Sequence, residues 1–148
     1  MPGLAQHSQI LAGIVGRDGS VGRTIEVATP AGSEEAILAE IDRLVAELLP
    51  NGARAVGIGV PMNLDPETGV AHRATNLPLD DVDIAGRIRD RFSVPVGIEN
   101  DANAAAWAEQ QVGAGAGASD VLFVALGTGL GAGLILRGEM YRGWMGFA

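Results

Sequence analysis

Residues 94–110 read Val-Pro-Val-Gly-Ile-Glu-Asn-Asp-Ala-Asn-Ala-Ala-Ala-Trp-Ala-Glu-Gln, and this stretch decides the fold. Its first part has the β-branched residues of a buried strand, and its alanine-rich part has helical spacing, seen at Ala104, Trp107, Ala108 and Gln111. Glu99, Asn100 and Asp101 therefore lie where a strand ends and a helix begins. In an open α/β sheet, ligands bind at this edge because backbone groups and helix N-termini converge there.

Asp101 has two interpretations. Aspartate is a preferred helix N-cap, and at an isolated junction of strand and helix a cap is commoner than a catalyst. Three polar side chains in a row, together with a glycine-rich segment further along the chain, favour a functional role instead. The residues alone leave both interpretations open.

The composition indicates one folded domain, or one and a fraction. A chain of 148 residues, 47% of them apolar, can bury about 70% of its unfolded surface. The net charge of −8 and the absence of a Lys/Arg cluster argue against a nucleic-acid or anionic-membrane partner. Cysteine is absent and no apolar run is long enough to span a bilayer, so we expect a soluble, cytoplasmic protein.

Hydrophobic periodicity predicts strands and helices in an α/β order. Residues 10–15 and 21–27 flank an Asp18-Gly19 turn and predict a hairpin. Ser33 is the expected N-cap of a helix that ends before Pro50. The remaining predicted elements are a strand at 55–60, a loop at 65–78, a helix at 80–91 with an acidic start and a basic end, and a strand at 120–126.

Three features of these elements can be functional or structural. Gly57 and Gly59 weaken a strand, so either a ligand approaches the backbone closely or the strand has a bulge or tight helix packing. Asn76 lies in the long predicted loop, where it could contact a ligand or form a turn. Residues 113–119, rich in glycine and alanine, are typical of a hinge or domain boundary.

Residues 127–133, Gly-Thr-Gly-Leu-Gly-Ala-Gly, formally fit the dinucleotide fingerprint G-x-G-x-x-[GA]. A Rossmann site needs a helix directly afterwards, whereas here a short apolar run and the Arg137-Gly138 turn follow, which predicts a strand, a glycine loop and a returning strand. A glycine-rich hairpin with a threonine can present N–H groups and a hydroxyl to phosphate. A plain tight hairpin is the structural alternative.

Four motifs, in their order and spacing, resemble those of the ROK family of bacterial sugar kinases, glucokinases among them, and related repressors. The resemblance runs from about Ile10 to the end of the chain. The motifs are Gly57-Ile58-Gly59-Val60-Pro61, Asn76-Leu77-Pro78, Glu99-Asn100-Asp101-Ala102-Asn103-Ala104, and the run from Leu126 to Gly133.

The resemblance implies an actin-like ATPase fold of two ribonuclease-H-like α/β lobes, each with a mixed sheet flanked by helices. Residues 1–117 would form the first lobe, and residues 118–148 would begin an incomplete second lobe with a glycine-rich hairpin. The implied reaction is ATP-dependent phosphorylation of glucose or a related hexose at its 6-hydroxyl, with Mg²⁺. The implied roles are Asp101 as the base, sugar binding by Gly59, Pro61, Asn76, Glu99 and Asn100, and phosphate binding by Gly127, Thr128 and Gly129, with no metal ligand assigned.

Three departures from the family pattern bear on activity. Residues 4–9 stand where the family has an Asp-x-Gly-Gly-Thr phosphate motif, Met62 replaces a usual glycine, and the family continues beyond residue 148 into further sugar- and zinc-binding segments. We therefore expect this chain alone to be inactive. The alternatives are a non-catalytic sugar-sensing regulator of the same family and an interaction module that self-associates through its exposed C-terminal hairpin.

Overall fold

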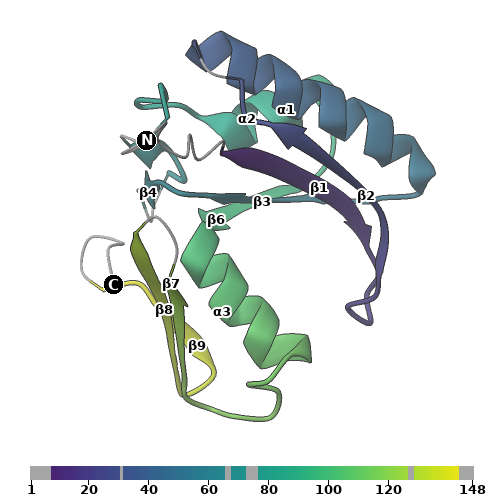
Figure 1. Ribbon diagram of the computed structural model, residues 1–148. Helices are drawn as coiled ribbons and strands as arrows, with labels where there is room; N and C mark the ends of the chain where they lie inside the picture. The colour runs from purple at the N-terminus through teal and green to yellow at the C-terminus, as the bar shows by residue number, and fades with distance from the viewer. Residues whose placement is uncertain (1–7, 31, 66–67, 73–76, 127–128, 144–148) are drawn as a thin grey trace, which may run out of the picture. The chain divides into compact units, whose positions relative to one another are not determined.

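The computed structural model describes residues 8–30, 32–65, 68–72, 77–126 and 129–143. The chain forms two compact units, residues 1–54 and 55–148. Each unit combines strands with helices (Figure 1), which confirms the predicted α/β class. The boundary expected between residues 117 and 118 separates two lobes of an actin-like fold, which differ from these two units, and it stays a prediction. None of the helices in the described ranges is long and apolar enough to cross a membrane.

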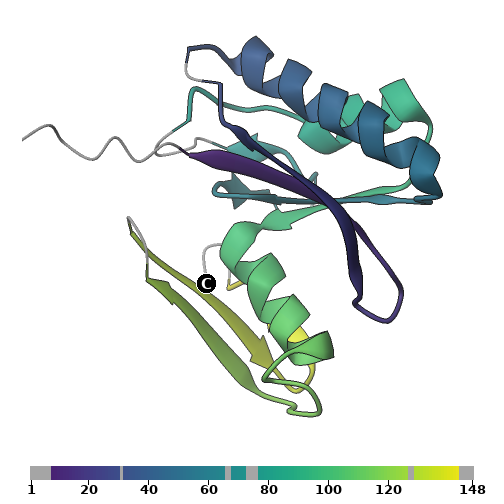
Figure 2. The ribbon, with the colours of Figure 1, turned by 45° about the vertical axis from the view of Figure 1, so that its right-hand side comes forward.

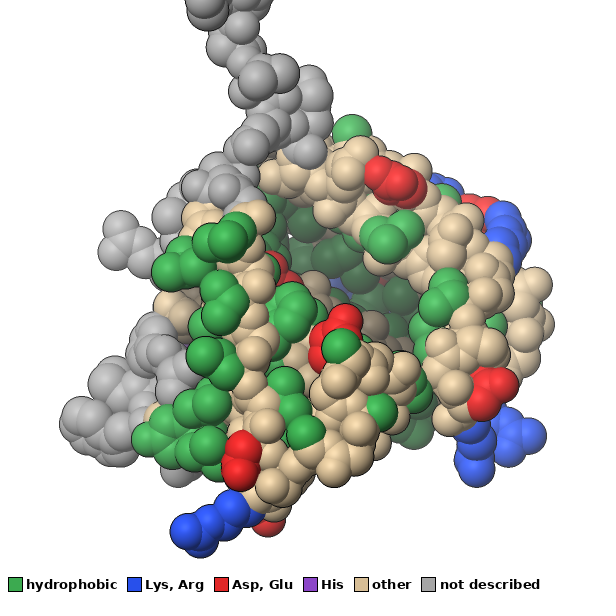
Figure 3. All heavy atoms as spheres, turned by 60° about the horizontal axis from the view of Figure 1, so that its bottom comes forward, with side chains coloured by type: hydrophobic (Ala, Val, Ile, Leu, Met, Phe, Trp, Pro, Cys, Tyr) green, Lys and Arg blue, Asp and Glu red, His purple; other side chains and the backbone are tan. Residues whose placement is uncertain are grey.

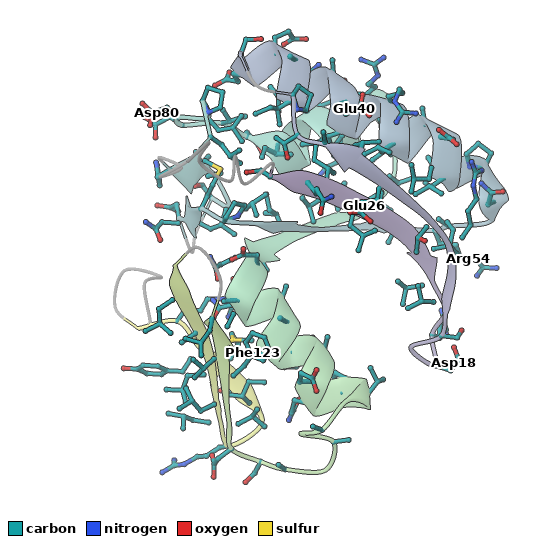
Figure 4. All side chains as sticks on the ribbon, in the orientation of Figure 1. Asp18, Glu26, Glu40, Arg54, Asp80 and Phe123 are labelled. Carbon is teal, nitrogen blue, oxygen red and sulfur yellow. The ribbon has the colours of Figure 1, made fainter. Side chains whose placement is uncertain are left out.

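The first unit begins with the predicted hairpin. Strands β1 (Gln9–Val15) and β2 (Val21–Ala28) pair antiparallel. Asp18 lies at the hairpin tip (Figure 4), where its Oδ1 accepts hydrogen bonds from the Ser20 hydroxyl at 2.6 Å and the Ser20 N–H at 3.1 Å. These bonds to Ser20 lower the pKa of the Asp18 carboxyl because they stabilise its charged form.

Helix α1 (Glu34–Leu48) confirms the predicted capping. The Ser33 hydroxyl accepts the Ala36 N–H at 3.2 Å, and a short 3₁₀ helix, η1 (Leu49–Asn51), follows before Gly52 at φ 93°. The helix buries one apolar stripe: Ile37, Leu38, Leu44 and Leu48. Glu40 lies on its exposed surface (Figure 4), where a hydrogen bond from Arg43 lowers the pKa of the Glu40 carboxyl.

A parallel strand pair forms the centre of the second unit. Strands β3 (Val56–Val60) and β6 (Val96–Asn100) run in parallel, and helix α2 (Ile84–Phe92) lies between them in the chain and packs on β6. Ile84 and Ile88 of this helix are fully buried. The helix begins four residues later than predicted, because Asp81 has a positive φ of 52° and Asp83 provides the cap.

A short antiparallel pair begins just before the loop expected at residues 65–78 and returns within it. Strands β4 (Asn63–Leu64) and β5 (Ala71–His72) form it, and Val82 extends it through a bridge to Ala71. The sequence did not indicate this pair because each strand has only two residues.

Helix α3 (Asp101–Val112) packs on an antiparallel sheet of β7 (Val121–Leu126), β8 (Leu130–Leu136) and β9 (Glu139–Tyr141), as Figures 1 and 2 show. Phe123 of β7 lies between this sheet and the helix (Figure 4). The helix buries Ala102, Asn103 and Ala106, whereas Trp107 is 45% exposed. One expectation is corrected. The returning strand begins at Leu130, so much of the predicted glycine loop is strand.

Candidate functional site

The parallel pairing of β3 with β6 brings two of the predicted motifs together. Gly59 lies directly opposite Glu99, and Val60 lies opposite Asn100. A Cβ atom placed on Gly59 would lie 3.6 Å from the Cα of Asp101 and 3.8 Å from the Cβ of Ala104. Gly59 therefore faces the start of α3 at ordinary contact distance, and Pro61 follows it as an exposed residue.

Asn100 is the N-cap of α3. Its Oδ1 accepts the N–H groups of Ala102 at 3.0 Å and Asn103 at 3.2 Å, and its Nδ2 donates to the Met62 carbonyl at 3.3 Å. The sequence had assigned the possible cap to Asp101, one residue further along. The half-buried Asn100 side chain thus joins the end of β6, the exit of β3 and the first turn of the helix.

Asp101 is the first residue of α3, and it is exposed. Its Oδ1 accepts the N–H of the next residue, Ala102, at 2.8 Å. Within the described ranges, Oδ2 has no hydrogen-bond partner. The carboxylate is therefore accessible to a ligand, and one of its oxygens is available to accept a hydrogen bond.

Both carboxylate oxygens of Glu99 are engaged. Oε1 accepts the Asn100 N–H at 3.0 Å and Nδ2 of Asn103 at 3.3 Å. Oε2 accepts Nε of Arg142 at 3.0 Å and Nη2 of the same guanidinium at 2.5 Å. The predicted contact of Glu99 with a sugar hydroxyl stays a prediction, and the structure gives this carboxylate protein partners on both sides.

The glycines of β8 contact helix α3. A Cβ placed on Gly133 would lie 2.6 Å from the Cβ of Ala106 and 2.7 Å from the carbonyl oxygen of Ala102, and one on Gly131 would lie 3.3 Å from the Cβ of Ala102. Strand β8 therefore runs alongside α3 in the same direction. Its first residues lie at the N-terminal end of the helix, which also carries Asp101.

The phosphate-binding prediction is only partly within the described ranges. Gly127 and Thr128, and Asn76 of the sugar-binding prediction, lie outside them. Gly129 is exposed, with nothing within 4 Å of a Cβ placed on it, and it precedes β8 at the end of the sheet beside the start of α3. This placement is compatible with a ligand that contacts both Gly129 and the Asp101 region.

Sequence reasoning missed two residues of this region. Asn103 is 2% exposed, and its position four residues after Glu99 is the one signal that could have paired them. Arg142 follows β9, and its contact with Glu99 spans 43 residues. That contact depends on a short third strand that was not predicted. No group of three or more His, Cys, Asp or Glu residues within the described part of the chain could hold a metal ion.

Both the structure and the sequence of the chain resemble those of known proteins. A Streptomyces griseus ROK family glucokinase, solved with glucose and AMPPNP, superposes with a TM-score of 0.87 and 38% identity, covering 95% of this chain and 45% of that one. The fold is accordingly that of the actin-like sugar kinases. Residues 7–148 match the ROK family, and the chain belongs to it.

The sequence relatives include both enzymes and regulators. A Streptomyces coelicolor glucokinase is 33% identical over 141 residues, which is 95% of this chain and 44% of that protein. A Caldicellulosiruptor bescii xylose repressor is 38% identical over 99 residues, which is 67% of this chain and 25% of the repressor. The chain thus spans less than half the length of the relatives that it matches.

Proposed function

We propose that this chain is the sugar-binding part of a hexose kinase that phosphorylates glucose or a related hexose at its 6-hydroxyl, with ATP as donor. The observation that carries the proposal is the exposed carboxylate of Asp101 at the junction of β6 and α3, beside the fixed amide of Asn100. The glucose and AMPPNP bound by the Streptomyces griseus relative support it. This chain alone would be inactive, because it spans 44–45% of the length of the glucokinases that it matches.

Each side chain has a definite part in this reaction. Asp101 accepts the hydroxyl proton as the sugar oxygen bonds to the γ-phosphorus and the bond from phosphorus to the leaving oxygen breaks. Because the transition state of phosphoryl transfer is loose, alignment matters more than base strength. Oδ1 of Asn100 already accepts two N–H groups, and one hydrogen of Nδ2 goes to Met62, so the second hydrogen of Nδ2 remains to donate to a sugar oxygen.

The donor site is the less complete half of the proposal. Gly127, Thr128 and Gly129 are proposed to hold phosphate through their N–H groups. Mg²⁺ bound to a nucleotide neutralises phosphate charge, keeps several waters and needs only one or two protein carboxylates. Asp101 is proposed as the base and the carboxylate of Glu99 is fully engaged, so we assign no metal ligand among the described residues.

Calorimetry tests the sugar site directly. We expect glucose to bind the purified chain, Asn100→Ala to abolish binding, and Asp101→Asn to retain it because an amide still accepts a hydrogen bond. Asn51→Ala and Asp90→Asn are matched controls on other elements and should bind like the parent. No glucose binding by the parent chain would refute the sugar site. If this chain phosphorylated glucose with ATP and lost that activity in Asp101→Asn, its proposed inactivity would be refuted, whereas the proposed sugar site would not.

A regulatory role is the second candidate, and the identity to a xylose repressor favours it. In that case the sugar would bind without phosphoryl transfer, even in a protein as long as the related kinases. A longer form that contains this chain, assayed for glucose-dependent release of ADP, separates the two roles. Turnover supports the kinase, whereas sugar binding without turnover supports the regulator.

We also propose that the chain self-associates through the outer face of β7 and β8. Alternate residues of these strands face α3, and the others form an uncharged apolar face that includes Leu122, Val124, Leu126, Leu130 and Leu136, 41–85% exposed. Figure 3 shows hydrophobic side chains gathered in a row along one side of the molecule. A second copy would cover this apolar face, while Glu139 of β9, opposite Leu136, would lie at its rim.

Sedimentation velocity over a range of concentrations tests this association. Leu122→Glu is expected to shift the chain to a monomer, because it places a charge in the middle of the face. Val112→Glu replaces an exposed apolar residue at the end of α3 and should leave the association unchanged. A parent chain that is monomeric at all concentrations would refute this proposal.

A further inference from the structure

The side chains of Asn103 and Arg142, which belong to two other segments, meet at the carboxylate of Glu99. Glu99 is the penultimate residue of β6, Asn103 lies in the first turn of α3, and Arg142 follows β9. Four hydrogen bonds converge on the carboxylate, two at each oxygen, with lengths of 2.5–3.3 Å. A carboxylate offers about four lone-pair sites, so the protein itself uses the hydrogen-bonding capacity of Glu99.

The burial of these side chains shows which bonds matter. The Glu99 side chain is 24% exposed and that of Arg142 is 48% exposed, so the ion pair is partly screened by solvent. Asn103 is 2% exposed, and its Oδ1 has no hydrogen-bond partner within the described part of the chain. Its bond to Glu99 is the one bond that its buried amide makes there. Loss of the Glu99 carboxylate would leave a buried amide without any partner, which is costly.

We propose that Glu99 is a positioning residue, which fixes the first turn of α3 to the β7–β9 sheet through Arg142 and thereby holds Asn100 and Asp101 in place. This inference rests on the proposed function in one respect only, namely that Asp101 and Asn100 act on the sugar. It revises the role expected from the sequence, in which Glu99 itself would bind a sugar hydroxyl.

The bond between Arg142 and Glu99 connects the β7–β9 sheet to strand β6. The glycines of β8 let the sheet approach α3 closely, but apolar contact alone does not stop one element from sliding along the other. The guanidinium of Arg142 adds a directional, charge-assisted bond between the sheet and the strand that carries the proposed sugar site. Gly129, proposed to hold phosphate, directly precedes β8 of the same sheet. The link therefore sets the separation between the proposed phosphate and sugar sites.

Amide hydrogen exchange tests the link without any ligand. The N–H groups of Ala102 and Asn103, both bonded to the Asn100 cap, are expected to exchange about tenfold faster in Glu99→Gln and in Arg142→Ala, because each variant loses charge-assisted bonds that hold the first turn of α3. The double variant should be no faster than Glu99→Gln, because coupled residues are not additive. Arg142→Lys should restore part of the protection, and Arg89→Ala, an exposed arginine on α2, is the matched control.

Glucose affinity then separates positioning from direct contact. If Glu99 positions Asn100, Arg142→Ala weakens glucose binding about tenfold, in parallel with hydrogen exchange. If Glu99 binds the sugar itself, Arg142→Ala frees its carboxylate and leaves affinity unchanged or tighter, which overturns the inference. Unchanged exchange in Arg142→Ala also overturns it, and this half-exposed arginine can be replaced even if Glu99→Gln does not fold. A parent chain without glucose affinity refutes the proposed function, while the exchange result still decides the link.

Discussion

Replacing Gly133 with alanine is expected to destabilise the second unit. The added methyl group would lie 2.6 Å from the Cβ of Ala106, which is 0.8 Å closer than the 3.4 Å at which ordinary contact begins, and 2.7 Å from the carbonyl oxygen of Ala102. Both neighbours belong to the helix, one of them to its backbone, so neither can rotate away. Overpacking of this kind costs about 1–3 kcal/mol, which outweighs the gain of about 0.4–1 kcal/mol from a less flexible unfolded chain.

Urea unfolding followed by circular dichroism measures this effect. The matched control is Gly57→Ala in β3, where nothing lies within 4 Å of the added methyl group, and where we expect a neutral change or a gain of up to about 1 kcal/mol. The two substitutions are chemically identical, so opposite signs would isolate the helix contact. A Gly133→Ala chain as stable as the parent would show that β8 does not approach α3 as closely as described.

Three further predictions concern a core residue, a cap and a turn. Ile88→Ala, at a fully buried position, is expected to lower the free energy of unfolding by about 2–5 kcal/mol in urea titrations, and a loss below 1 kcal/mol would contradict that burial. Asn100→Ala should cost about 0.5–2 kcal/mol more than Asn100→Ser, which keeps a cap oxygen and, like alanine, loses the bond to Met62; equal stability of the two would mean that Asn100 does not cap α3. Ser20→Ala should raise the pKa of Asp18 in an NMR titration. The pKa of Asp18 is lower in the folded than in the unfolded chain, so its carboxylate stabilises the hairpin above its ordinary pKa of about 3.9, and this stabilisation is lost as pH falls through the folded pKa. An Asp18 pKa that Ser20→Ala leaves unchanged would refute the bond.

The sequence predicted those elements whose signals are local. The Asp18-Gly19 turn, the Ser33 cap and the apolar stripe of α1 each depend on residues within a few positions of one another, and all three are confirmed. The order of strand, polar junction and helix around Asp101 is confirmed for the same reason. In each case, spacing and capping chemistry determine the structure directly.

The features that the sequence did not indicate depend on contacts between distant segments. The inward face of α3 is set by β8, whose glycines select Ala102 and Ala106 over the larger Trp107. The bond of Arg142 to Glu99 follows from a three-residue strand that has no periodicity to detect. The alternative interpretation of Asp101 as the helix cap is wrong by one residue, and here the reason is local, because adjacent asparagine and aspartate are equally good caps.

The bond from Asn100 to residue 62 has a consequence for which substitutions the junction tolerates. The amide of Asn100 donates to a main-chain carbonyl, and every amino acid supplies that acceptor. The side chain at position 62 takes no part in the bond, so the buried side chain of Met62 adds apolar contacts without disturbing the junction. A change of residue 62 would therefore alter the shape of the interior while the bond that holds Asn100 beside Asp101 is kept.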